Sequence, residues 1–258
     1  MNETPLSSNS PADGTSVPEP QHITVHMPAG RPWSVYTLMA VSIGVYLLQL
    51  TGQYLLGGDV LATWGVKYAP YIAQGQWWRL VTPIFLHGSI LHIGFNMYAL
   101  YVIGPVLERF WGWRRFLGLY FLAGVAGNVF SLWFTREPSL GSSTAIFGLL
   151  AAEGILVYCN GFLFQNPRST LKSLGNLALI NFVIGLSPGI DNWGHLGGFL
   201  GGAAFAWLAG PLFLIVPAGN TAYLRDQRAP ASVWRAAFVV SLSLGVLIAG
   251  WLWVYAVR

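Results

Sequence analysis

The sequence predicts an all-α polytopic membrane protein, with a core of six membrane-spanning helices and a seventh span near the C-terminus. Of its 258 residues, 54% are hydrophobic and only 9% are charged, whereas a soluble domain has about 25% charged residues. Apolar runs recur from Trp33 onward, and a helix needs roughly 20 such residues to cross a bilayer. The net charge of +4 is not gathered into a basic stripe, so no nucleic acid is expected as a partner.

Residues 1–32 are predicted to form a disordered N-terminal tail. They are rich in Pro, Ser and Asn, and they contain Glu3, Asp13 and Glu19 but no basic residue before Arg31. Acidic residues without arginine argue against a mitochondrial transit peptide, and the lack of an early apolar run argues against a cleaved signal peptide. We therefore expect a bacterial plasma membrane rather than an organelle.

The predicted core covers residues 33–216, with spans at 34–52, 89–107, 115–135, 143–159, 172–187 and 194–216. Residues 53–88, between the first two spans, combine several Trp and Tyr with two prolines. This composition is typical of a structure in the headgroup region rather than of another span. Residues 217–258 are expected to form a cytoplasmic linker followed by the seventh span at 235–256.

The distribution of Lys and Arg predicts a cytoplasmic N-terminus. In this orientation nine basic residues fall on cytoplasmic segments and four on the opposite side. His92, Asn96, Ser143 and His195 then all lie near the outer ends of their spans. Polar side chains inside spans are costly and usually functional, so the shared depth predicts one site.

Ser143 follows Gly141 at the start of an apolar run, where a serine can be either a helix N-cap or a nucleophile. In the second interpretation, Gly141 lets the backbone bend close to a substrate carbonyl. The Ser143 amide then faces an oxyanion with the help of the helix dipole.

His195 lies three residues before Gly198, and Gly198 and Gly202 form a stripe of small residues that allows close helix packing. If the neighbouring helix begins with Ser143, His195 can be the general base of a Ser–His pair. The alternative is a buried histidine that bridges two helices. Gly197 and Gly201 form a second stripe, so the spacing leaves the contacting face open.

His92 and Asn96 are four residues apart and share a helix face, from which both can donate hydrogen bonds to an oxyanion. His87 is off this face and is expected to end the loop or to order water in a cavity shared with His92 and Asn96. No H-E-x-x-H spacing or carboxylate partner accompanies the histidines, so neither a metal ion nor another cofactor is expected.

Phe147 lies one turn after Ser143 and is expected to stack on the imidazole ring of His195. Asp191, the nearest carboxylate to His195 in sequence, is assigned to the outer loop. The sequence therefore predicts a Ser–His dyad rather than a triad.

Together these motifs resemble the rhomboid family of intramembrane serine proteases. The resemblance covers about residues 60–205 and rests on five stretches in order: Gly75–Arg79 with Phe85–His87, His92–Asn96, Leu107–Gly112, Gly141–Gly148 and Asp191–His195.

The resemblance implies that Ser143 is the nucleophile, His195 its base, and His92, Asn96 and the Ser143 amide the oxyanion donors. It also implies the family's form with six helices plus one. Thr144 stands where the serine motif of the family commonly has glycine, and it is expected to tune local packing.

The expected function is cleavage of transmembrane protein substrates near the outer face of the membrane, with these substrates and the lipid bilayer as partners. The alternative is a non-catalytic protein that binds transmembrane clients through the same polar cavity. A transporter is disfavoured because the polar residues gather on one side of the membrane. The sequence does not indicate the physiological substrate or the oligomeric state.

Overall fold

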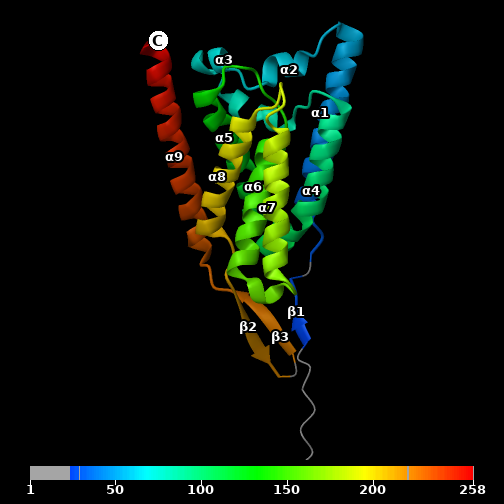
Figure 1. Ribbon diagram of the computed structural model, residues 1–258, viewed down its shortest axis with the longest axis vertical. Helices are drawn as coiled ribbons and strands as arrows, with labels where there is room; N and C mark the ends of the chain where they lie inside the picture. The colour runs from blue at the N-terminus through cyan, green and yellow to red at the C-terminus, as the bar shows by residue number, and fades with distance from the viewer. Residues whose placement is uncertain (1–23, 29, 220, 258) are drawn as a thin grey trace, which may run out of the picture.

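The protein is described by a computed structural model over residues 24–28, 30–219 and 221–257. Long helices run side by side, short helices close one end, and a small sheet lies at the other end (Figure 1). A long helix occurs at each predicted span: α1 (Trp33–Leu56), α4 (Ile90–Trp111), α5 (Trp113–Phe134), α6 (Ser143–Cys159), α7 (Pro167–Ile184), α8 (Asn192–Ala209) and α9 (Pro230–Val257). The predicted fold class, an all-α polytopic membrane protein, is confirmed.

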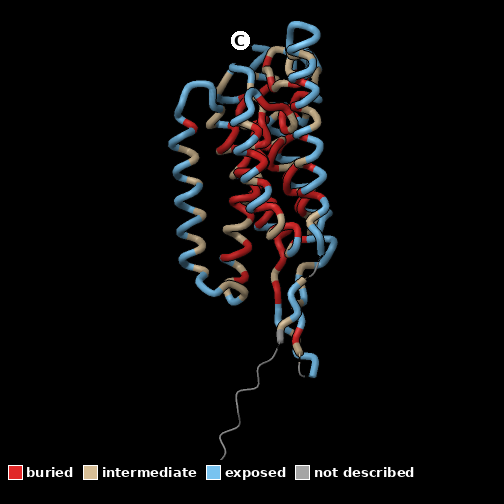
Figure 2. The backbone as a smooth tube through the Cα atoms, turned by 90° about the vertical axis from the view of Figure 1, so that its right-hand side faces the viewer, coloured by how far each residue is buried: buried red, intermediate tan, exposed pale blue. Residues whose placement is uncertain are grey.

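The helices differ in how much of their surface other helices cover. Among the described residues, α1, α4, α5 and α9 are long and apolar enough to cross a membrane, and α6 is a shorter apolar helix of 17 residues. Helix α6 packs against α4, α5, α7 and α8, and its apolar composition on all sides suits this buried position. Figure 2 shows the buried segments gathered along the middle of the bundle, with exposed segments outside.

The connection between α1 and α4 begins later than the predicted residue 53, because α1 continues to Leu56, and it contains only short helices. These are α2 (Val60–Gly65), α3 (Ala69–Ala73) and the 3₁₀ turns η1 (Trp77–Leu80) and η2 (Thr82–Phe85). The Arg79 guanidinium donates to the carbonyl oxygens of Thr63 and Val66, each at 2.9 Å, and lies 4.6 Å from the ring centre of Tyr71. One buried arginine therefore holds the turns of this connection together.

A glutamate caps α1 from the neighbouring helix. The residue before α1 is Pro32, which makes no side-chain cap. The carboxylate of Glu108, near the end of α4, accepts hydrogen bonds from the backbone N–H groups of Ser34 and Val35, both at 2.9 Å. A negative charge at a helix N-terminus also favours the helix dipole, so Glu108 fixes the antiparallel pairing of α1 with α4.

The end of one span differs from the sequence prediction at the opposite end of the bundle. The expected span at 194–216 is too long, because α8 ends at Ala209 and residues Phe213–Ala218 form strand β2. Gly210 is extended and Pro211 follows it, so the helix cannot continue. A short apolar run does not distinguish helix from strand by periodicity, and the run from α8 into β2 is continuously apolar.

The predicted disordered tail and cytoplasmic linker also contain strands. Strand β1 (Thr24–His26) pairs in parallel with β3 (Thr221–Asp226), which pairs antiparallel with β2, in the order β1-β3-β2. Assigning all of residues 1–32 to disorder was therefore wrong at β1, because three residues of low hydrophobicity gain a partner only from a strand about 200 residues away. Residues 1–23 lie outside the described residues.

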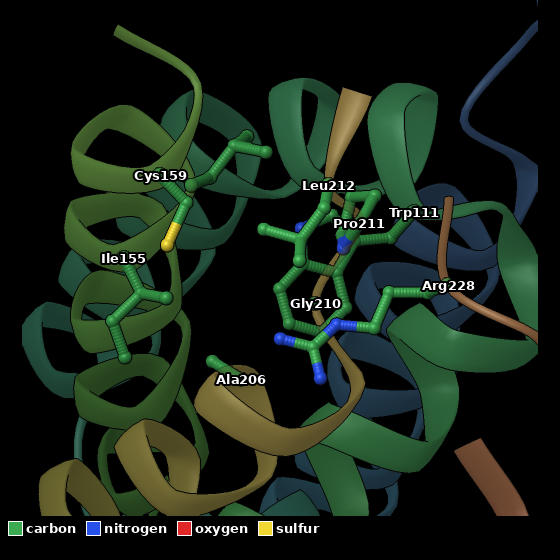
Figure 3. A pocket seen from close by; sticks show the side chains of 9 residues that line it. Trp111, Ile155, Cys159, Ala206, Gly210, Pro211, Leu212 and Arg228 are labelled. Atoms are coloured by element: carbon green, nitrogen blue, oxygen red, sulfur yellow. The ribbon is translucent and has the colours of Figure 1, made fainter. Parts of the chain in front are cut away.

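A cavity of about 10 Å³ lies at the sheet end of the bundle, where α4, α6 and α8 terminate (Figure 3). Its lining includes Trp111, Cys159 and Arg228. The Arg228 guanidinium donates to the last carbonyl oxygens of α8, at Trp207 and Leu208. Because Cys159 ends the helix that Ser143 begins, the 17 residues of α6 separate this cavity from Ser143 by about 24 Å.

Candidate active site

Ser143 is presented by a sharp bend at the start of α6. Gly141 has φ +128°, and its N–H donates to the Pro83 carbonyl at 2.9 Å. A Cβ on Gly141 would lie 2.6 Å from His92 Nε2, so the position requires glycine both for its backbone angle and for the close approach. Ser142 occupies the N-cap position without a side-chain cap, which leaves the Ser143 hydroxyl free of the capping role.

His195 lies in the first turn of α8 and reaches Ser143 across the helix interface. Its Nε2 lies 2.9 Å from Ser143 Oγ. The imidazole stacks on Phe147, with ring centroids 4.5 Å apart and an angle of 14° between the planes. His195 is only 8% exposed, and its Nδ1 has no hydrogen-bond partner among the described residues. Serine and histidine thus form a pair whose ring is held by an aromatic side chain rather than by a carboxylate.

The Gly198–Gly202 stripe faces α6. A Cβ on Gly198 would overlap the backbone carbonyl of Thr144, and a Cβ on Gly202 would overlap the backbone of Gly148. The two helices therefore approach at backbone distance just below the Ser143–His195 pair. Close approach of this kind is available only to glycine.

The second stripe, Gly197 and Gly201, is used as well. A Cβ on Gly197 would overlap Phe130, and a Cβ on Gly201 would overlap Ala126, both on α5. Helix α8 therefore fits closely between α5 and α6. The spacing left the contacting face open because both faces make contacts.

Thr144 fits where the family motif commonly has glycine because the glycines lie on its neighbours. A Cβ on Gly127 of α5 would lie 2.6 Å from the Thr144 Cβ, and a Cβ on Gly194 would lie 3.2 Å from the Thr144 Cγ2. The hydroxyl of Thr144 is buried and has no hydrogen-bond partner in the described part of the chain. The bend at Gly141 forms with threonine present.

His87 and His92 both lie beside the loop that leads into Ser143, residues 135–142, which we call the serine loop. His87 is 1% exposed, and its Nε2 lies 3.3 Å from the Ser142 hydroxyl, while its Nδ1 lies 3.3 Å from the Phe85 carbonyl. The rings of His87 and His92 pack edge to face with centroids 5.2 Å apart. His87 therefore supports the backbone before Ser143, a contact that the sequence spacing did not reveal.

Burial, reinforced by the neighbouring His92, lowers the pKa of His87 to about 4. The imidazole is therefore neutral at pH 7 and carries one N–H. The Phe85 carbonyl can only accept, so the proton belongs on Nδ1. Nε2 then accepts a hydrogen bond from the Ser142 hydroxyl.

The side chain of Asn96, a predicted oxyanion donor, is bonded within its own helix. Its Nδ2 donates to the His92 carbonyl of its own helix at 3.0 Å. The residue is 6% exposed and lies one turn below His92. The amide must turn away from this carbonyl before it can donate to an oxyanion beside Ser143.

A buried polar cluster close to the pair escaped the sequence analysis. The Lys67 ammonium is fully buried and donates to Ser131 Oγ at 2.7 Å, and Ser131 Oγ donates to Asp191 Oδ2 at 2.5 Å. Asp191 is the N-cap of α8, accepting from the Gly194 N–H at 2.8 Å. The Asp191 carboxylate is thus bonded to Ser131 and Gly194, and among the described residues no hydrogen bond joins it to the His195 imidazole. The available signal was the scarcity of charge in residues 53–88, which contain only Asp59, Lys67 and Arg79.

Burial alone would raise the pKa of Asp191. The Lys67 ammonium, the hydroxyls of Ser131 and Ser139 and the Gly194 N–H outweigh burial and hold the pKa below its usual range. Asp191 is therefore ionised at neutral pH, and Lys67 faces a negative charge.

An open hollow of about 380 Å³ lies beside the α7–α8 loop at this end of the bundle. It is lined by Phe134, Thr135 and the segment from Gly185 to Trp193. Neither Ser143 nor His195 lines it, so it borders the candidate site without containing the pair.

Comparison with known proteins places these motifs in a family. The Rhomboid domain profile matches residues 74–212, which is more than half of the chain. Rhomboid protease GluP of Bacillus subtilis (strain 168) is 38% identical over 178 residues, covering 67% of this chain and 34% of that protein. Rhomboid-like protease 3 of Toxoplasma gondii is 34% identical over 185 residues, covering 68% of this chain and 69% of that protein.

Rhomboid-type serine protease 2 of Emericella nidulans is 38% identical over 134 residues, or 51% of this chain and 27% of that protein. The chain thus corresponds to about a third of GluP but to most of the Toxoplasma protein. The matched region contains Arg79, His92, Ser143 and His195. The resemblance seen in the motifs is confirmed, and the chain belongs to the rhomboid family of intramembrane serine proteases.

Proposed function

We propose that this protein is an intramembrane serine endopeptidase in which Ser143 is the nucleophile and His195 is its general base. The observation that carries the proposal is the 2.9 Å separation of Ser143 Oγ and His195 Nε2, side chains of two different helices. A nucleophile needs an adjacent base within hydrogen-bond reach, and this pair meets that requirement.

In the proposed reaction, Ser143 Oγ attacks the scissile carbonyl carbon while His195 Nε2 takes the hydroxyl proton. The tetrahedral intermediate collapses, and His195 returns the proton to the leaving amine. Water, deprotonated by the same Nε2, then attacks the acyl carbon. The bond from this carbon to Ser143 Oγ breaks, the acid is released, and Nε2 returns the proton to Ser143 Oγ. The stacking of Phe147 keeps the imidazole oriented through both steps. In a Ser–His–Asp triad the carboxylate has this role.

The oxyanion is proposed to bind the Ser143 amide, His92 and Asn96. The amide lies at the N-terminus of α6, where the helix dipole favours negative charge. His92 is already beside Gly141, and Asn96 joins after its amide leaves the His92 carbonyl. Preorganised donors of this kind typically contribute about 3 kcal/mol each to the transition state.

The substrates are proposed to be transmembrane proteins that are cut near the outer face of a bacterial plasma membrane, with the N-terminus of the enzyme in the cytoplasm. The loop before Ser143 bonds to Lys67 and Pro83, in the connection whose helices α2 and α3 lie at one end of the bundle (Figure 1). Water would reach the pair past His87, His92 and Asn96. Because a helical peptide bond is shielded, segments with helix-weakening residues such as glycine are the preferred substrates.

Ser143→Ala tests the proposal in the detergent-solubilised full chain. The variant should lose cleavage of a reporter transmembrane helix by at least 1,000-fold while still binding it. It should also lose labelling by a fluorophosphonate, whose attachment site in the wild type is mapped by mass spectrometry. Ser243→Ala, at an exposed position on α9, is the control and should cleave normally.

Two other outcomes would contradict the proposal. Cleavage that survives Ser143→Ala would exclude this serine as the nucleophile. Equal binding of the reporter by wild type and variant, with no cleavage by either, would support the rival function of a non-catalytic client-binding protein.

A further inference from the structure

We infer that Lys67 is a positioning residue, which connects the serine loop to the first turn of α8, the helix that carries His195. The inference rests on the proposed roles of Ser143 and His195. It concerns neither residue directly, because Lys67 bonds to Ser139 in the loop before Ser143, to Ser131 on α5 and to Asp191 at the start of α8.

The backbone of Lys67 holds the approach to Ser143. The Lys67 N–H donates to the Ser139 carbonyl at 2.9 Å, and the Ser139 N–H donates to the Lys67 carbonyl at 3.0 Å. Two residues further on, Gly141 donates to the Pro83 carbonyl. The loop before Ser143 is thus attached at two points to the connection between α1 and α4.

The side chain of Lys67 reaches the other half of the site. Its Nζ donates to Ser131 Oγ and lies 3.7 Å from Asp191 Oδ2. Asp191 caps α8 through its side chain, and its carbonyl accepts from the His195 N–H at 3.1 Å. The position of the lysine charge is therefore coupled to the first turn of α8, which carries the imidazole.

Burial makes this connection specific. Lys67 is fully buried and Asp191 nearly so, and a buried charge that loses its partner is strongly destabilising. Such pairs typically contribute little net stability over an apolar replacement, and they can instead select one arrangement of the surrounding elements. Here the selected arrangement is the one that aligns Ser143 with His195.

The contacts of Lys67 should affect the reaction rate, because a serine–histidine pair works only when its two groups are aligned. A displacement of about 1 Å between reacting groups can cost about 100-fold in rate. Loss of the Lys67 side chain removes its contacts to Ser131 and to the N-cap residue of α8, Asp191, while the glycine contacts of α8 with α6 remain. Turnover should therefore fall without a matching loss of substrate affinity.

The experiment compares Lys67→Met, Lys67→Arg and the double variant Lys67→Met/Asp191→Asn in the full chain. Asparagine keeps an N-cap on α8, so the double variant removes the buried charges and keeps the cap. Three quantities are measured: kcat and KM on a reporter transmembrane helix, the rate of fluorophosphonate labelling at Ser143, and Tm. Lys172→Met, at an exposed position on α7, is the matched control.

We expect Lys67→Met to lower Tm, and to lower kcat and the labelling rate at least tenfold per folded molecule with KM within twofold. Lys67→Arg should recover part of both rates because it keeps the charge. The double variant should recover Tm but not the rates, since the contacts of the Lys67 ammonium with Ser131 and Asp191 are still missing. Lys172→Met should match the wild type throughout.

Recovery of the rates together with Tm in the double variant would overturn the inference, because only charge balance would then matter. Wild-type rates in Lys67→Met would overturn it as well, with the proposed function intact. If the wild type itself is neither labelled at Ser143 nor active, the proposed function fails, and the inference falls with it.

Discussion

Ser143 and His195 are close because glycines, which have no side chain, surround them. Gly141 makes room for His92, and Gly198 makes room for the backbone of Thr144. A Cβ on Gly141 would collide with the His92 imidazole, and a Cβ on Gly198 would collide with the backbone next to Ser143. At the level of single residues, the geometry of the site depends as much on its glycines as on its polar side chains.

The role of Asn96 can be tested by truncation. Asn96→Ala should lower kcat by about 100- to 1,000-fold with KM nearly unchanged, because an oxyanion donor acts only in the transition state. The measurement is steady-state cleavage of the reporter helix. Asn181→Ala is the matched control, since Asn181 also donates to a carbonyl four residues earlier, that of Leu177, but on α7. Equal losses of kcat in the two variants would show that the loss comes from the missing hydrogen bond within the helix and not from a missing oxyanion donor.

His87 predicts a pH dependence of stability. Burial and the nearby His92 lower its pKa from 6.5 to about 4. Above pH 6.5 the imidazole is neutral in both folded and unfolded chains, so it contributes no pH dependence there. Below pH 6.5 the unfolded chain binds the proton and the folded chain does not. The free energy of unfolding therefore falls as the pH drops toward 4, by a total on the order of 3 kcal/mol.

His87→Gln removes this titration and keeps a polar partner for Ser142. The fall in Tm between pH 7.5 and pH 4.5 should therefore be smaller in His87→Gln than in the wild type. His26→Gln, at an exposed position on β1, should behave like the wild type. An identical fall in Tm for all three proteins would rule out His87 as the titrating group.

The sequence predicted the residues whose chemistry is visible in a local pattern. Ser143, His195 and Phe147 stand in short motifs, and the structure places them together. Lys67 and Ser131 have no such pattern, because they meet across 64 residues of chain. Their pairing depends on how the connection between α1 and α4 docks on α5, which hydrophobic periodicity does not specify.

At the scale of elements, the contact of α6 with α8 determines the distance between Ser143 and His195. Apolar runs located both helices from the sequence, but not the helices that they pack against. The two glycine stripes on α8 allowed either face to pack, and in the structure one faces α6 and the other faces α5. The end of α8 was missed because the apolar run continues into β2, where Pro211 rather than polarity ends the helix.

A methyl group at the α6–α8 contact should separate the dyad. Gly198→Ala places a Cβ against the Thr144 carbonyl, and two helix backbones must move apart to accept it. We expect stability to fall by about 1–3 kcal/mol and kcat to fall by at least 100-fold. Thermal unfolding and reporter cleavage measure the two effects.

Gly154→Ala is the control for this change, because Gly154 lies on α6 with no atom within 4 Å of its added Cβ. Alanine favours a helix over glycine by up to about 1 kcal/mol, so this variant should be active and at least as stable as the wild type. Full activity of Gly198→Ala would show that the close approach of the helices is not needed for the dyad.

At the scale of the whole molecule, the two ends of the bundle are built differently. The Ser143 end is closed by α2, α3 and the 3₁₀ turns, while the other end carries the three-stranded sheet (Figure 1). Loop 135–142 leads into Ser143 at the first end, and α7 begins at the second. The orientation of the bundle in the membrane therefore decides which compartment supplies water to the dyad.

The excess of Lys and Arg predicts that the sheet end is cytoplasmic, since nine basic residues fall on that side and four on the other. The single native cysteine, Cys159, is first replaced by serine. One new cysteine is then introduced at an exposed position, either Glu137→Cys in the loop between α5 and α6 or Ser169→Cys near the start of α7. In intact bacteria, a membrane-impermeant maleimide should label the cysteine at position 137 and spare the one at 169.

Inverted membrane vesicles should give the reverse pattern, and detergent should expose both positions. Labelling of position 169 in intact cells would place the dyad on the cytoplasmic side, where cytoplasmic water would complete the reaction. That result would overturn the proposed cleavage at the outer face. It would leave the Ser143–His195 chemistry standing, because the distance between the two groups does not depend on which side of the membrane they occupy.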